Sequence, residues 1–240
     1  MSNLSIVIPV YNSYCSLDEL IESLKLRYPE CEIVLVDDNS HDDSFSKLKE
    51  LYERYNSLKI IRLDKNYGQQ QAIKCGLKFT SHEYIVTMDD DLQHPVSEIS
   101  KLVTEVKKGF DVCYGVSLHK PQKCFRKLGS KLTDKLFNLI TKKPNDIKVS
   151  SFRCLNRQIV DQINQDKTSF VYLSAITLKL TKNITTIEVA NNQRKYGKSQ
   201  YNYWKLFKLF IKLYIYYQDK TWLKVFRVTK KQYSIAEKYI

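Results

Sequence analysis

Three consecutive aspartates, Asp89, Asp90 and Asp91, are the residues of this chain whose type and spacing point most directly to chemistry. They follow the apolar run Tyr84–Met88, which has the composition of a buried strand. Side chains alternate along an extended strand end, so we expect Asp89 and Asp91 on one side, within reach of a single hard cation. Such an ion, Mg²⁺ or Mn²⁺, could bridge the two phosphates of a nucleotide diphosphate and neutralise it as a leaving group. A solvated acidic turn is the simpler alternative, and the buried strand before it argues against that.

A second acidic pair, Asp37 and Asp38, follows the apolar run Glu32–Val36. Carboxylates in this position could accept hydrogen bonds from the hydroxyls of a ribose or from the edge of a base. The alternative is a helix N-cap formed with Ser40 or Asp42, because Asp and Ser favour that position. Both interpretations hold together if Asp38 contacts the ligand and a later residue caps the helix.

Two further segments have compositions suited to a nucleotide. Pro9–Asn12 ends the first apolar run and offers the ring of Tyr11 and backbone groups to a base, although a strand-ending turn explains the segment equally well. Residues 194–199 have the sequence Arg-Lys-Tyr-Gly-Lys-Ser, and a glycine-containing turn with an arginine, a lysine and a hydroxyl suits an anionic diphosphate. A basic surface loop is the alternative for this second segment.

These segments need a scaffold that brings them together, and the first 120 residues have the pattern of one. Short apolar runs predict strands at Leu4–Val10, Glu32–Val36, Leu58–Leu63, Tyr84–Met88 and Asp111–Val116. Apolar residues at helical spacing lie between them. Strands joined by single helices predict an α/β fold, with a Rossmann-like, mostly parallel sheet and helices on both faces. Ligands bind beyond the carboxyl ends of the strands in such sheets, which is where the acidic clusters lie.

Composition narrows the class of protein. The chain has 240 residues, of which 43% are hydrophobic, and this is enough apolar material for a core and excludes a disordered chain. Its 6 cysteines are scattered without a Cys-x-x-Cys pair, which indicates a reducing, cytoplasmic environment rather than a metal site. We find neither a signal-peptide pattern nor an apolar stretch long enough for a membrane span.

The net charge of +13 conceals an asymmetry between two parts of the chain. Residues 1–100 carry 17 acidic and 10 basic side chains, whereas residues 101–240 carry 9 acidic and 29 basic ones. The acidic residues 1–100 suggest a site for a cation, and the basic residues 101–240 suggest the binding of anions. A nucleic-acid-binding protein is a competing interpretation of the basic charge, and we disfavour it because the acidic triad would repel nucleic acid.

Four motifs occur in order and at suitable separations, namely Ile6–Asn12, Ile33–Ser40, Asn66–Gly68 and Met88–Pro95. Together they resemble the family 2 glycosyltransferases with the GT-A fold, and most closely the dolichyl- or polyprenyl-phosphate sugar synthase branch. The resemblance is strong over residues 4–116 and looser over residues 117–200. It implies an inverting transfer of a sugar from a nucleotide-diphosphate sugar to an acceptor, with Mg²⁺ or Mn²⁺ as cofactor.

The resemblance assigns roles to residues on the donor side. It implies that the nucleotide base and ribose are held by Pro9, Tyr11 and Asp38. It implies that the metal and the donor diphosphate are bound by Asp89 and Asp91, with a nearby metal-site residue at Gln93. The element that closes over the diphosphate corresponds to Arg194, Gly197, Lys198 and Ser199.

On the acceptor side, the resemblance implies that Arg126 and Ser130 hold the phosphate of the acceptor. The chain departs from the family at Ser151, which stands directly before Phe152 where an acid is common. A serine alone is no general base, and Asp146 is the nearest carboxylate for that role. A phosphate acceptor is already anionic at neutral pH, so it needs no base, and this fits the missing acid.

Residues 201–240 are predicted to form a unit of their own after a catalytic domain at residues 1–200. The helical stretch Tyr201–Tyr217 is apolar except for a narrow stripe of lysines. Aromatic residues flanked by lysines suit the headgroup region of an anionic membrane, so we expect peripheral attachment of this amphipathic, basic unit at the inner, cytoplasmic face. A core or dimer helix is the alternative. A strand is predicted at Thr185–Ala190, and residues 218–240 are left unassigned.

Two hypotheses differ in the chemical class of the acceptor that receives the sugar. The arginine-containing elements favour a polyprenyl-phosphate lipid, whereas a saccharide acceptor in cell-surface polysaccharide assembly is the alternative. A non-catalytic binding relative with the same fold is a third hypothesis, kept open by the missing acid before Phe152 and by Ser117, which stands where members of the family often have an arginine.

Overall fold

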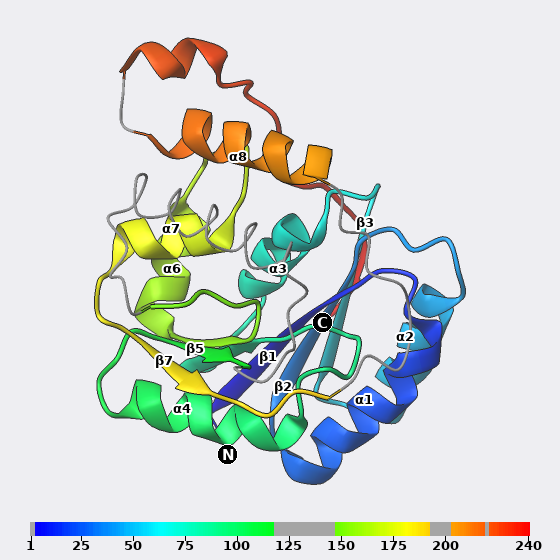
Figure 1. Cartoon of the computed structure of the whole chain (residues 1–240). Helices are drawn as coiled ribbons and strands as arrows, with labels where there is room; N and C mark the ends of the chain where they lie inside the picture. Colours follow the sequence, from blue (N-terminus) through cyan, green and yellow to red (C-terminus); the bar gives the residue numbers. More distant parts are fainter. Residues whose placement is uncertain (1–2, 118–146, 193–202, 219–220) are drawn as a thin grey trace.

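The computed structural model describes residues 3–117, 147–192, 203–218 and 221–240. These residues form an eight-stranded sheet between two layers of helices (Figure 1). The strands are β1 (Leu4–Val10), β2 (Glu32–Asp37), β3 (Leu58–Leu63), β4 (Tyr84–Thr87), β5 (Val112–Val116), β6 (Arg153–Asn156), β7 (Ile184–Glu188) and β8 (Ile235–Tyr239). Their order across the sheet is β7-β5-β6-β4-β1-β2-β3-β8.

The central strands β4, β1, β2 and β3 run parallel to one another, so their carboxyl ends lie at the same edge of the sheet. The predicted α/β fold with a mostly parallel sheet is confirmed. Strands β1 to β5 begin and end within one residue of the predicted bounds. Their apolar runs are buried throughout β1 and β2 because helices cover both faces.

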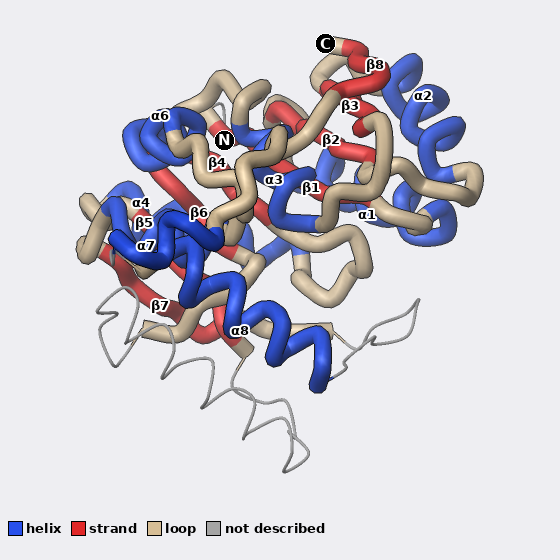
Figure 2. The backbone as a smooth tube through the Cα atoms, turned by 90° about the horizontal axis from the view of Figure 1, so that it is seen from above, coloured by secondary structure: helices blue, strands red, loops and turns tan. Residues whose placement is uncertain are grey.

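The helices cover the two faces in separate groups (Figures 1 and 2). One face carries α1 (Tyr14–Arg27), α2 (Ser44–Arg54) and α4 (Ile99–Lys107), the last preceded by the short 3₁₀ helix η1 (Val96–Glu98). The other face carries α3 (Gln69–Leu77), α6 (Arg157–Gln165), α7 (Leu173–Leu180) and α8 (Tyr203–Tyr217). Side chains of β1 alternate between the two cores, with Ile6 and Ile8 in the first core and Val7 in the second.

Helix α3 packs closely on the sheet because of Gly76. A Cβ atom at this position would lie 2.5 Å from Cγ1 of Val7 and 3.0 Å from Cγ2 of Val36, so a larger residue would push the helix away. The close approach holds α3 over β1 and β2. It thereby places the first residue of the helix, Gln69, at the carboxyl edge of the sheet.

The structure contains two strands that the sequence pattern does not predict. Strand β6 lies between β4 and β5 and is antiparallel to both, and β8 pairs with the outer edge of β3, also antiparallel. Strand β6 is only four residues long and begins with the buried Arg153, so it lacks an apolar run. Strand β8 carries exposed charged residues, as edge strands do when they avoid further pairing. The strand expected at Thr185–Ala190 is present as β7.

The C-terminal segment returns to the sheet. After α8 the chain forms the 3₁₀ helix η2 (Thr221–Phe226) and then enters β8 beside β3. The end of α8 is anchored by Tyr217, whose hydroxyl donates to the carbonyl of Phe170 (2.7 Å) and accepts from the N–H of Tyr172 (2.9 Å). Within the described part of the chain, no helix combines the length and the apolar character that crossing a bilayer requires.

A buried ion pair joins three strands at the amino end of the sheet. The carboxylate of Glu32 accepts from the Ser5 hydroxyl (2.6 Å) and from the Ser81 hydroxyl (2.7 Å), and it pairs with Nζ of Lys59 at 2.7 Å. Burial by itself raises the pKa of Glu32, but the hydrogen bonds from Lys59, Ser5 and Ser81 outweigh it and lower the pKa from 4.5 to about 2. The folded protein therefore favours the charged form of Glu32.

We predict that Glu32→Gln lowers the free energy of unfolding by about 3 kcal/mol at neutral pH, because of the difference between the folded and unfolded pKa values of Glu32. The contribution of the charged carboxylate is complete above pH 4.5 and is lost as the pH falls through that value toward about 2. Urea unfolding at neutral pH and at a pH between these two values measures the difference between variant and parent. The difference should shrink at the acidic pH.

The matched control for this prediction is Glu50→Gln. Glu50 is exposed and pairs with Lys47 within α2 at 2.8 Å. Exposed pairs of this kind contribute less than about 1 kcal/mol, so this variant should unfold almost as the parent does at both pH values. A Glu32→Gln effect of equal size at both pH values would contradict the role of the ionised carboxylate.

Candidate active site

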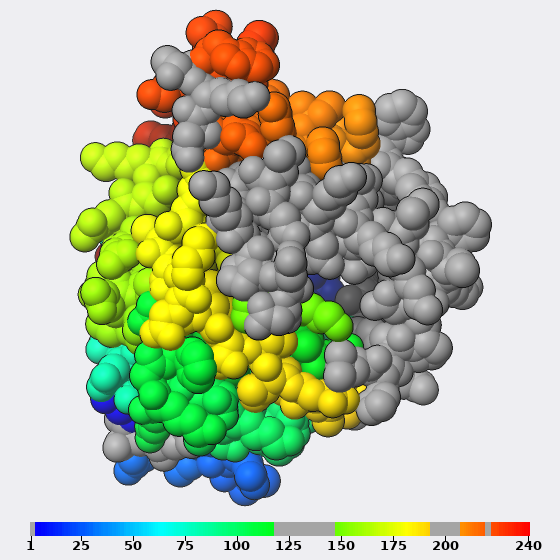
Figure 3. Space-filling view, turned by 60° about the vertical axis from the view of Figure 1, so that its left-hand side comes forward, coloured from blue at the N-terminus to red at the C-terminus, as the bar shows by residue number. Residues whose placement is uncertain are grey.

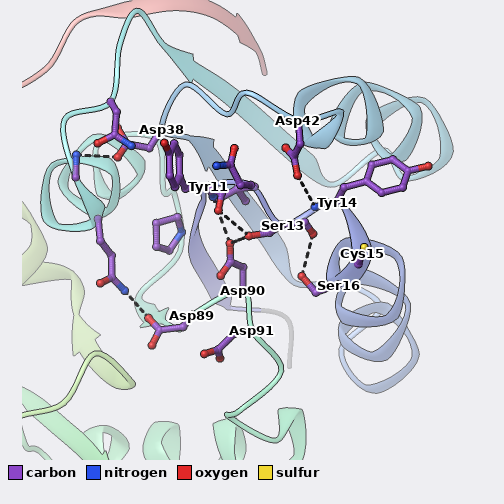
Figure 4. Close-up of a pocket in the computed structure, with 16 residues that line it drawn as sticks. Tyr11, Ser13, Tyr14, Cys15, Ser16, Asp38, Asp42, Asp89, Asp90 and Asp91 are labelled. Atoms are coloured by element: carbon purple, nitrogen blue, oxygen red, sulfur yellow. Dashed lines mark hydrogen bonds between the residues drawn. The ribbon is translucent and has the colours of Figure 1, made fainter. Parts of the chain in front are cut away.

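A pocket of about 800 Å³ opens at the carboxyl ends of β1, β2 and β4 (Figure 4). Its walls come from the loops after β1, β2 and β3, from the start of α1 and α3, and from the residues after β4. The lining residues are Pro9, Val10, Tyr11, Asn12, Ser13, Tyr14, Cys15, Ser16, Asp38, Asp42, Asn66, Gly68, Gln69, Asp89, Asp90 and Asp91. The parallel sheet thus brings together the residues predicted for the nucleotide and the metal, namely Pro9, Tyr11, Asp38, Asp89 and Asp91.

The chain makes sharp turns around the pocket through left-handed backbone conformations. Asn12 has φ 53°, Asn39 has φ 58° and Leu92 has φ 59°. Asparagine tolerates this region, whereas leucine rarely adopts it. The three residues follow β1, β2 and the acidic triad, so each turn lies directly after residues that line the pocket. Such conformations persist only where the surroundings hold them, which indicates a site whose backbone is fixed in advance.

Asp38 anchors the loop between β3 and α3, and only 3% of its surface is exposed. Its Oδ1 accepts from the N–H of Tyr67 and its Oδ2 accepts from the N–H of Gly68, both at 2.7 Å. Burial raises the pKa of Asp38 although the two amides lower it. The N-cap of α2 is Asp43, whose side chain makes no capping hydrogen bond, so the predicted cap by Ser40 or Asp42 is wrong, although Oδ1 of Asp42 accepts from the N–H of Ser44 at 3.1 Å. Asp38 therefore holds one wall of the pocket.

The loop after β1 is fastened to the loop after β2. The N–H of Asn12 donates to the Ser40 hydroxyl (3.0 Å), and Oδ1 of Asn12 accepts from the N–H of His41 (2.9 Å). The ring of Tyr11 is 43% exposed at the pocket and lies edge-on to His41, with 6.3 Å between the ring centroids. An aromatic face is thus available beside the pocket, in a loop that is held in place.

The three aspartates after β4 face different ways. Oδ2 of Asp90 accepts from the Ser13 hydroxyl and from the N–H of Tyr11, the latter at 3.3 Å. Figure 4 shows Asp90 turned toward Ser13, and Asp89 and Asp91 turned away from it. Asp90 therefore holds the loop after β1 by hydrogen bonds, and Asp89 and Asp91 remain as the candidate ligands for a cation.

The electrostatics of the triad favour a cation. Burial raises the pKa of Asp90 to about 6, and the neighbouring charges of Asp89 and Asp91 add to the rise against the hydrogen bonds that lower it. In the described ranges, no three acidic, histidine or cysteine side chains converge to form a complete metal site. Two carboxylates nevertheless fit a Mg²⁺ or Mn²⁺ ion, because such ions take their other ligands from water and substrate phosphates. Gln93 follows closely, and its N–H donates to Oδ1 of Asp91 at 3.1 Å.

Sequence reasoning misses two residues that contact Asp89. The side-chain amide of Gln69 donates to Oδ1 of Asp89 at 2.6 Å, and the Ser151 hydroxyl donates to Oδ2 at 2.9 Å. Gln69 directly follows the motif Asn66–Gly68, and this position in the sequence could have indicated that it belongs to the site. For Ser151 the only indication in the sequence is indirect, namely its position directly before Phe152 where the family commonly has an acid.

Some predicted residues lie outside the described residues. They are Arg126, Ser130, Asp146, Arg194, Gly197, Lys198 and Ser199. Their assignments to the diphosphate, to the acceptor and to a general base therefore stay predictions.

Comparison with known proteins decides the family. The chain matches the family model of glycosyl transferase family 2 over residues 5–164, a range that contains the whole pocket. The chain belongs to this family. The predicted resemblance is thus confirmed.

Two relatives within glycosyl transferase family 2 are bacterial enzymes. The chain is 33% identical over 214 residues to the undecaprenyl-phosphate 4-deoxy-4-formamido-L-arabinose transferase of Proteus mirabilis (strain HI4320). The aligned region covers 87% of this chain and 66% of the relative. It is 33% identical over 210 residues to the protein of the same name from Enterobacter sp. (strain 638). That aligned region covers 85% of this chain and 64% of the relative. The chain thus spans slightly less than two thirds of the length of these relatives.

Solved structures agree on the GT-A fold. The mannosyltransferase PcManGT of Pyrobaculum calidifontis, in complex with GDP-Man and Mn²⁺, superposes with a TM-score of 0.62 at 15% identity, over 95% of this chain and 65% of that one. The glucosyl-3-phosphoglycerate synthase of Mycobacterium tuberculosis, in complex with UDP, gives a TM-score of 0.60 at 14% identity, over 89% of this chain and 78% of that one.

We predict that Asp90→Ala weakens nucleotide binding and leaves the binding of a divalent cation intact. The substitution removes the acceptor that the Ser13 hydroxyl and the Tyr11 N–H share, so the loop after β1 loses its anchor. Calorimetry with UDP should show an affinity about tenfold lower, or about 1.4 kcal/mol. Titration of Mn²⁺ without nucleotide is the internal control. Equal loss of both ligands would assign Asp90 to the cation site instead.

Proposed function

We propose that this chain is an inverting glycosyltransferase that moves a sugar from a nucleotide-diphosphate sugar to the phosphate of a polyprenyl-phosphate lipid. The observation that carries the proposal is the pocket at the carboxyl ends of parallel strands, in which Asp89 and Asp91 face a cavity of about 800 Å³. That volume suits a nucleotide sugar. Support for the acceptor comes from the two bacterial relatives, which by name act on undecaprenyl phosphate.

The donor nucleoside is proposed to bind along the loop after β1. The ring of Tyr11 stacks on the base, and Pro9 lines the same wall of the pocket. Asp38 accepts a hydrogen bond from the ribose in addition to its two loop amides, since each carboxylate oxygen has two lone pairs. The same residue thus shapes the pocket and binds the donor.

The donor diphosphate is proposed to bind between the acidic triad and the basic segment at residues 194–199. Asp89 and Asp91 hold a Mg²⁺ or Mn²⁺ ion, with Gln93 next to them. When bound, the ion neutralises the charge that develops on the departing diphosphate. Arg194, Lys198 and Ser199 donate hydrogen bonds to the same leaving group. PcManGT contains Mn²⁺ with GDP-Man, and a second structure of the Mycobacterium tuberculosis synthase contains Mn²⁺ with UDP and phosphoglyceric acid, which supports this arrangement.

The acceptor phosphate is proposed to be held by Arg126 and Ser130. A phosphate is largely ionised at neutral pH, so one of its oxygens can attack the sugar carbon without losing a proton to the protein. Attack in line with the departing diphosphate inverts the configuration at that carbon. Ser151, which is no base, is compatible with this chemistry. A saccharide hydroxyl would instead need a general base, for which Asp146 is the candidate.

We also propose that α8, η2 and the residues just after η2, within the predicted unit at residues 201–240, attach the protein to the inner, cytoplasmic face of a membrane. Helices α8 and η2 lie together at one end of the molecule (Figure 3). They expose large apolar side chains, between 41% and 85% of the surface of each, at Phe207, Ile211, Trp222, Val225, Phe226 and Val228. Exposed lysines accompany them at Lys208, Lys212, Lys224 and Lys230. Apolar side chains mixed with cations suit an anionic lipid surface.

The short helix η2 is held against α8, so the two present one surface. The guanidinium of Arg227 donates to the carbonyls of Ile215 (2.9 Å) and Gln218 (2.6 Å) at the end of α8. The hydroxyl of Tyr216 donates to the carbonyl of Val228 (3.1 Å) and accepts from its N–H (2.9 Å). A fixed apolar surface of this kind costs less to insert into a membrane interface than a disordered tail, which would lose conformational freedom on binding.

We predict that Asp91→Ala slows sugar transfer at least about 100-fold, because the charge on the departing diphosphate then lacks the cation that would stabilise it. The assay measures transfer to undecaprenyl phosphate with Mn²⁺, from each nucleotide sugar that raises the melting temperature of the protein. Loss of one charge-stabilising group in a water-excluded site costs at least about 100-fold in rate. Asp43→Ala is the control, since Asp43 is exposed and lies outside the pocket.

Two outcomes would overturn parts of this function. Transfer that survives in Asp91→Ala with the metal chelated would refute the metal-assisted reaction. Transfer to a saccharide but not to undecaprenyl phosphate would refute the acceptor.

For the membrane surface, we predict that Trp222→Glu reduces binding to liposomes that contain an anionic lipid, because a carboxylate at this exposed site opposes both insertion and charge attraction. Flotation of the protein with such liposomes measures the bound fraction. Leu26→Glu is the matched control, since Leu26 is 88% exposed on α1, away from η2. Unchanged flotation of Trp222→Glu would exclude η2 from the membrane contact.

A further inference from the structure

The carboxylate of Asp89 is held from two sides by neutral hydrogen-bond donors. Gln69 Nε2 lies 2.6 Å from Oδ1, and Ser151 Oγ lies 2.9 Å from Oδ2. The two donors come from different parts of the chain, since Gln69 begins α3 and Ser151 precedes β6. The carboxylate is therefore clamped between two elements that meet only in the folded protein.

Ser151 is itself fixed by the strand that carries Asp89. The hydroxyl of Thr87, buried in β4, donates to the carbonyl of Ser151 at 2.6 Å. Nε of the buried Arg153 lies 3.5 Å from the same carbonyl. Ser151 thus binds the end of β4 twice, through its backbone to Thr87 and through its side chain to Asp89.

Gln69 is fixed by the way α3 starts. The amide just before it, that of Gly68, donates to the buried Asp38 at 2.7 Å. Further along α3, the close packing of Gly76 on β1 and β2 sets the position of the helix. The side chain of Gln70 accepts from the N–H of Leu173, at the start of α7, at 3.0 Å. The donor nitrogen of Gln69 is thereby held at one place relative to Asp89.

Neutral donors have a specific consequence for a carboxylate that binds a cation. An amide and a hydroxyl fix the torsion of the side chain without cancelling its charge, which a lysine or an arginine would do. Each oxygen of Asp89 still has a second lone pair for a metal ion. Hydrogen bonds from outside the ligand set orient metal-binding side chains, and their loss typically weakens metal binding about 10- to 100-fold.

We propose that Ser151 and Gln69 are positioning residues that hold Asp89 in the orientation in which it binds the divalent cation. This inference rests on the proposed function, because it takes Asp89 as a ligand of the ion. It gives Ser151 a task that does not require a base, although it stands directly before Phe152 where an acid is common in the family.

The test measures Mn²⁺ affinity directly, from the electron paramagnetic resonance signal of the free ion, with UDP present and no acceptor. Ser151→Ala and Gln69→Ala should each weaken Mn²⁺ binding about tenfold, and the double variant should weaken it further. Ser151→Thr keeps the hydroxyl and should bind Mn²⁺ as the parent does. Melting temperatures without metal should match that of the parent.

The controls are the neighbouring residues of the same type. Ser150→Ala removes a hydroxyl that accepts from the N–H of Phe152 (3.2 Å) and does not contact Asp89. Gln71→Ala shortens a side chain in the same turn of α3 as Gln69. Both variants should keep the Mn²⁺ affinity of the parent.

The outcomes separate this inference from the proposed function. If Asp89→Asn loses Mn²⁺ binding while Ser151→Ala and Gln69→Ala keep it, the positioning role is wrong and the proposed function stands. If Asp89→Asn binds Mn²⁺ as the parent does, the cation site is elsewhere and both fail. Equal loss in Ser151→Thr and Ser151→Ala would reveal a general structural effect and would also overturn the positioning role.

Discussion

The pocket depends on one constraint, which is that its buried and half-buried carboxylates, Asp38, Asp89 and Asp90, need hydrogen-bond donors. Burying an unpaired charge costs several kcal/mol, on the order of what holds a whole domain together. Asp38 takes its donors from the loop between β3 and α3, and Asp90 takes them from the loop after β1. Asp89 takes them from α3 and from the segment before β6. The acids thus hold in place the loops that form the walls around them.

Glu32 at the amino end of the sheet and the carboxylates of the pocket have different kinds of partner. At the amino end, Glu32 has a lysine partner, and its pKa falls to about 2. In the pocket, the partners of Asp38, Asp89 and Asp90 are amides and hydroxyls, and burial raises the pKa of Asp90 to about 6 against the hydrogen bonds that lower it. Neutral partners orient a carboxylate and leave its charge in place. The charge of Glu32 is therefore balanced by that of Lys59, whereas the hydrogen bonds to Asp89 come from neutral groups and leave its charge for a cation.

The sequence was sufficient for the part of the fold that carries the chemistry. Strands β1 to β5 are mostly buried, so they appear as short runs rich in apolar residues, and the residues after β1 to β4 line the pocket. Strand β6 leaves no such pattern, because it is four residues long and begins with Arg153. The contact between Ser151 and Asp89 joins residues 62 positions apart and depends on β6 lying beside β4. No local pattern predicts that pairing, so Ser151 could not be identified as a partner of Asp89 from the sequence.

The return of the C-terminal segment to the sheet connects the proposed membrane surface with the donor pocket. The N–H of Asp64 donates to the carbonyl of Ser234 (3.1 Å), just before β8, and Asp64 begins the loop that carries Gly68. Gln232 donates to the carbonyl of Asp166 (3.0 Å), whose carboxylate lies 3.6 Å from Nζ of the buried Lys74 in α3. In the proposed function the acceptor lies in a membrane and the donor binds in the pocket, so transfer would require a fixed geometry between the two. The C-terminal segment bonds directly to the residue after β3 and is linked through Asp166 to α3. These links would supply that geometry, because they tie the proposed membrane surface to the elements that carry Gly68 and Gln69.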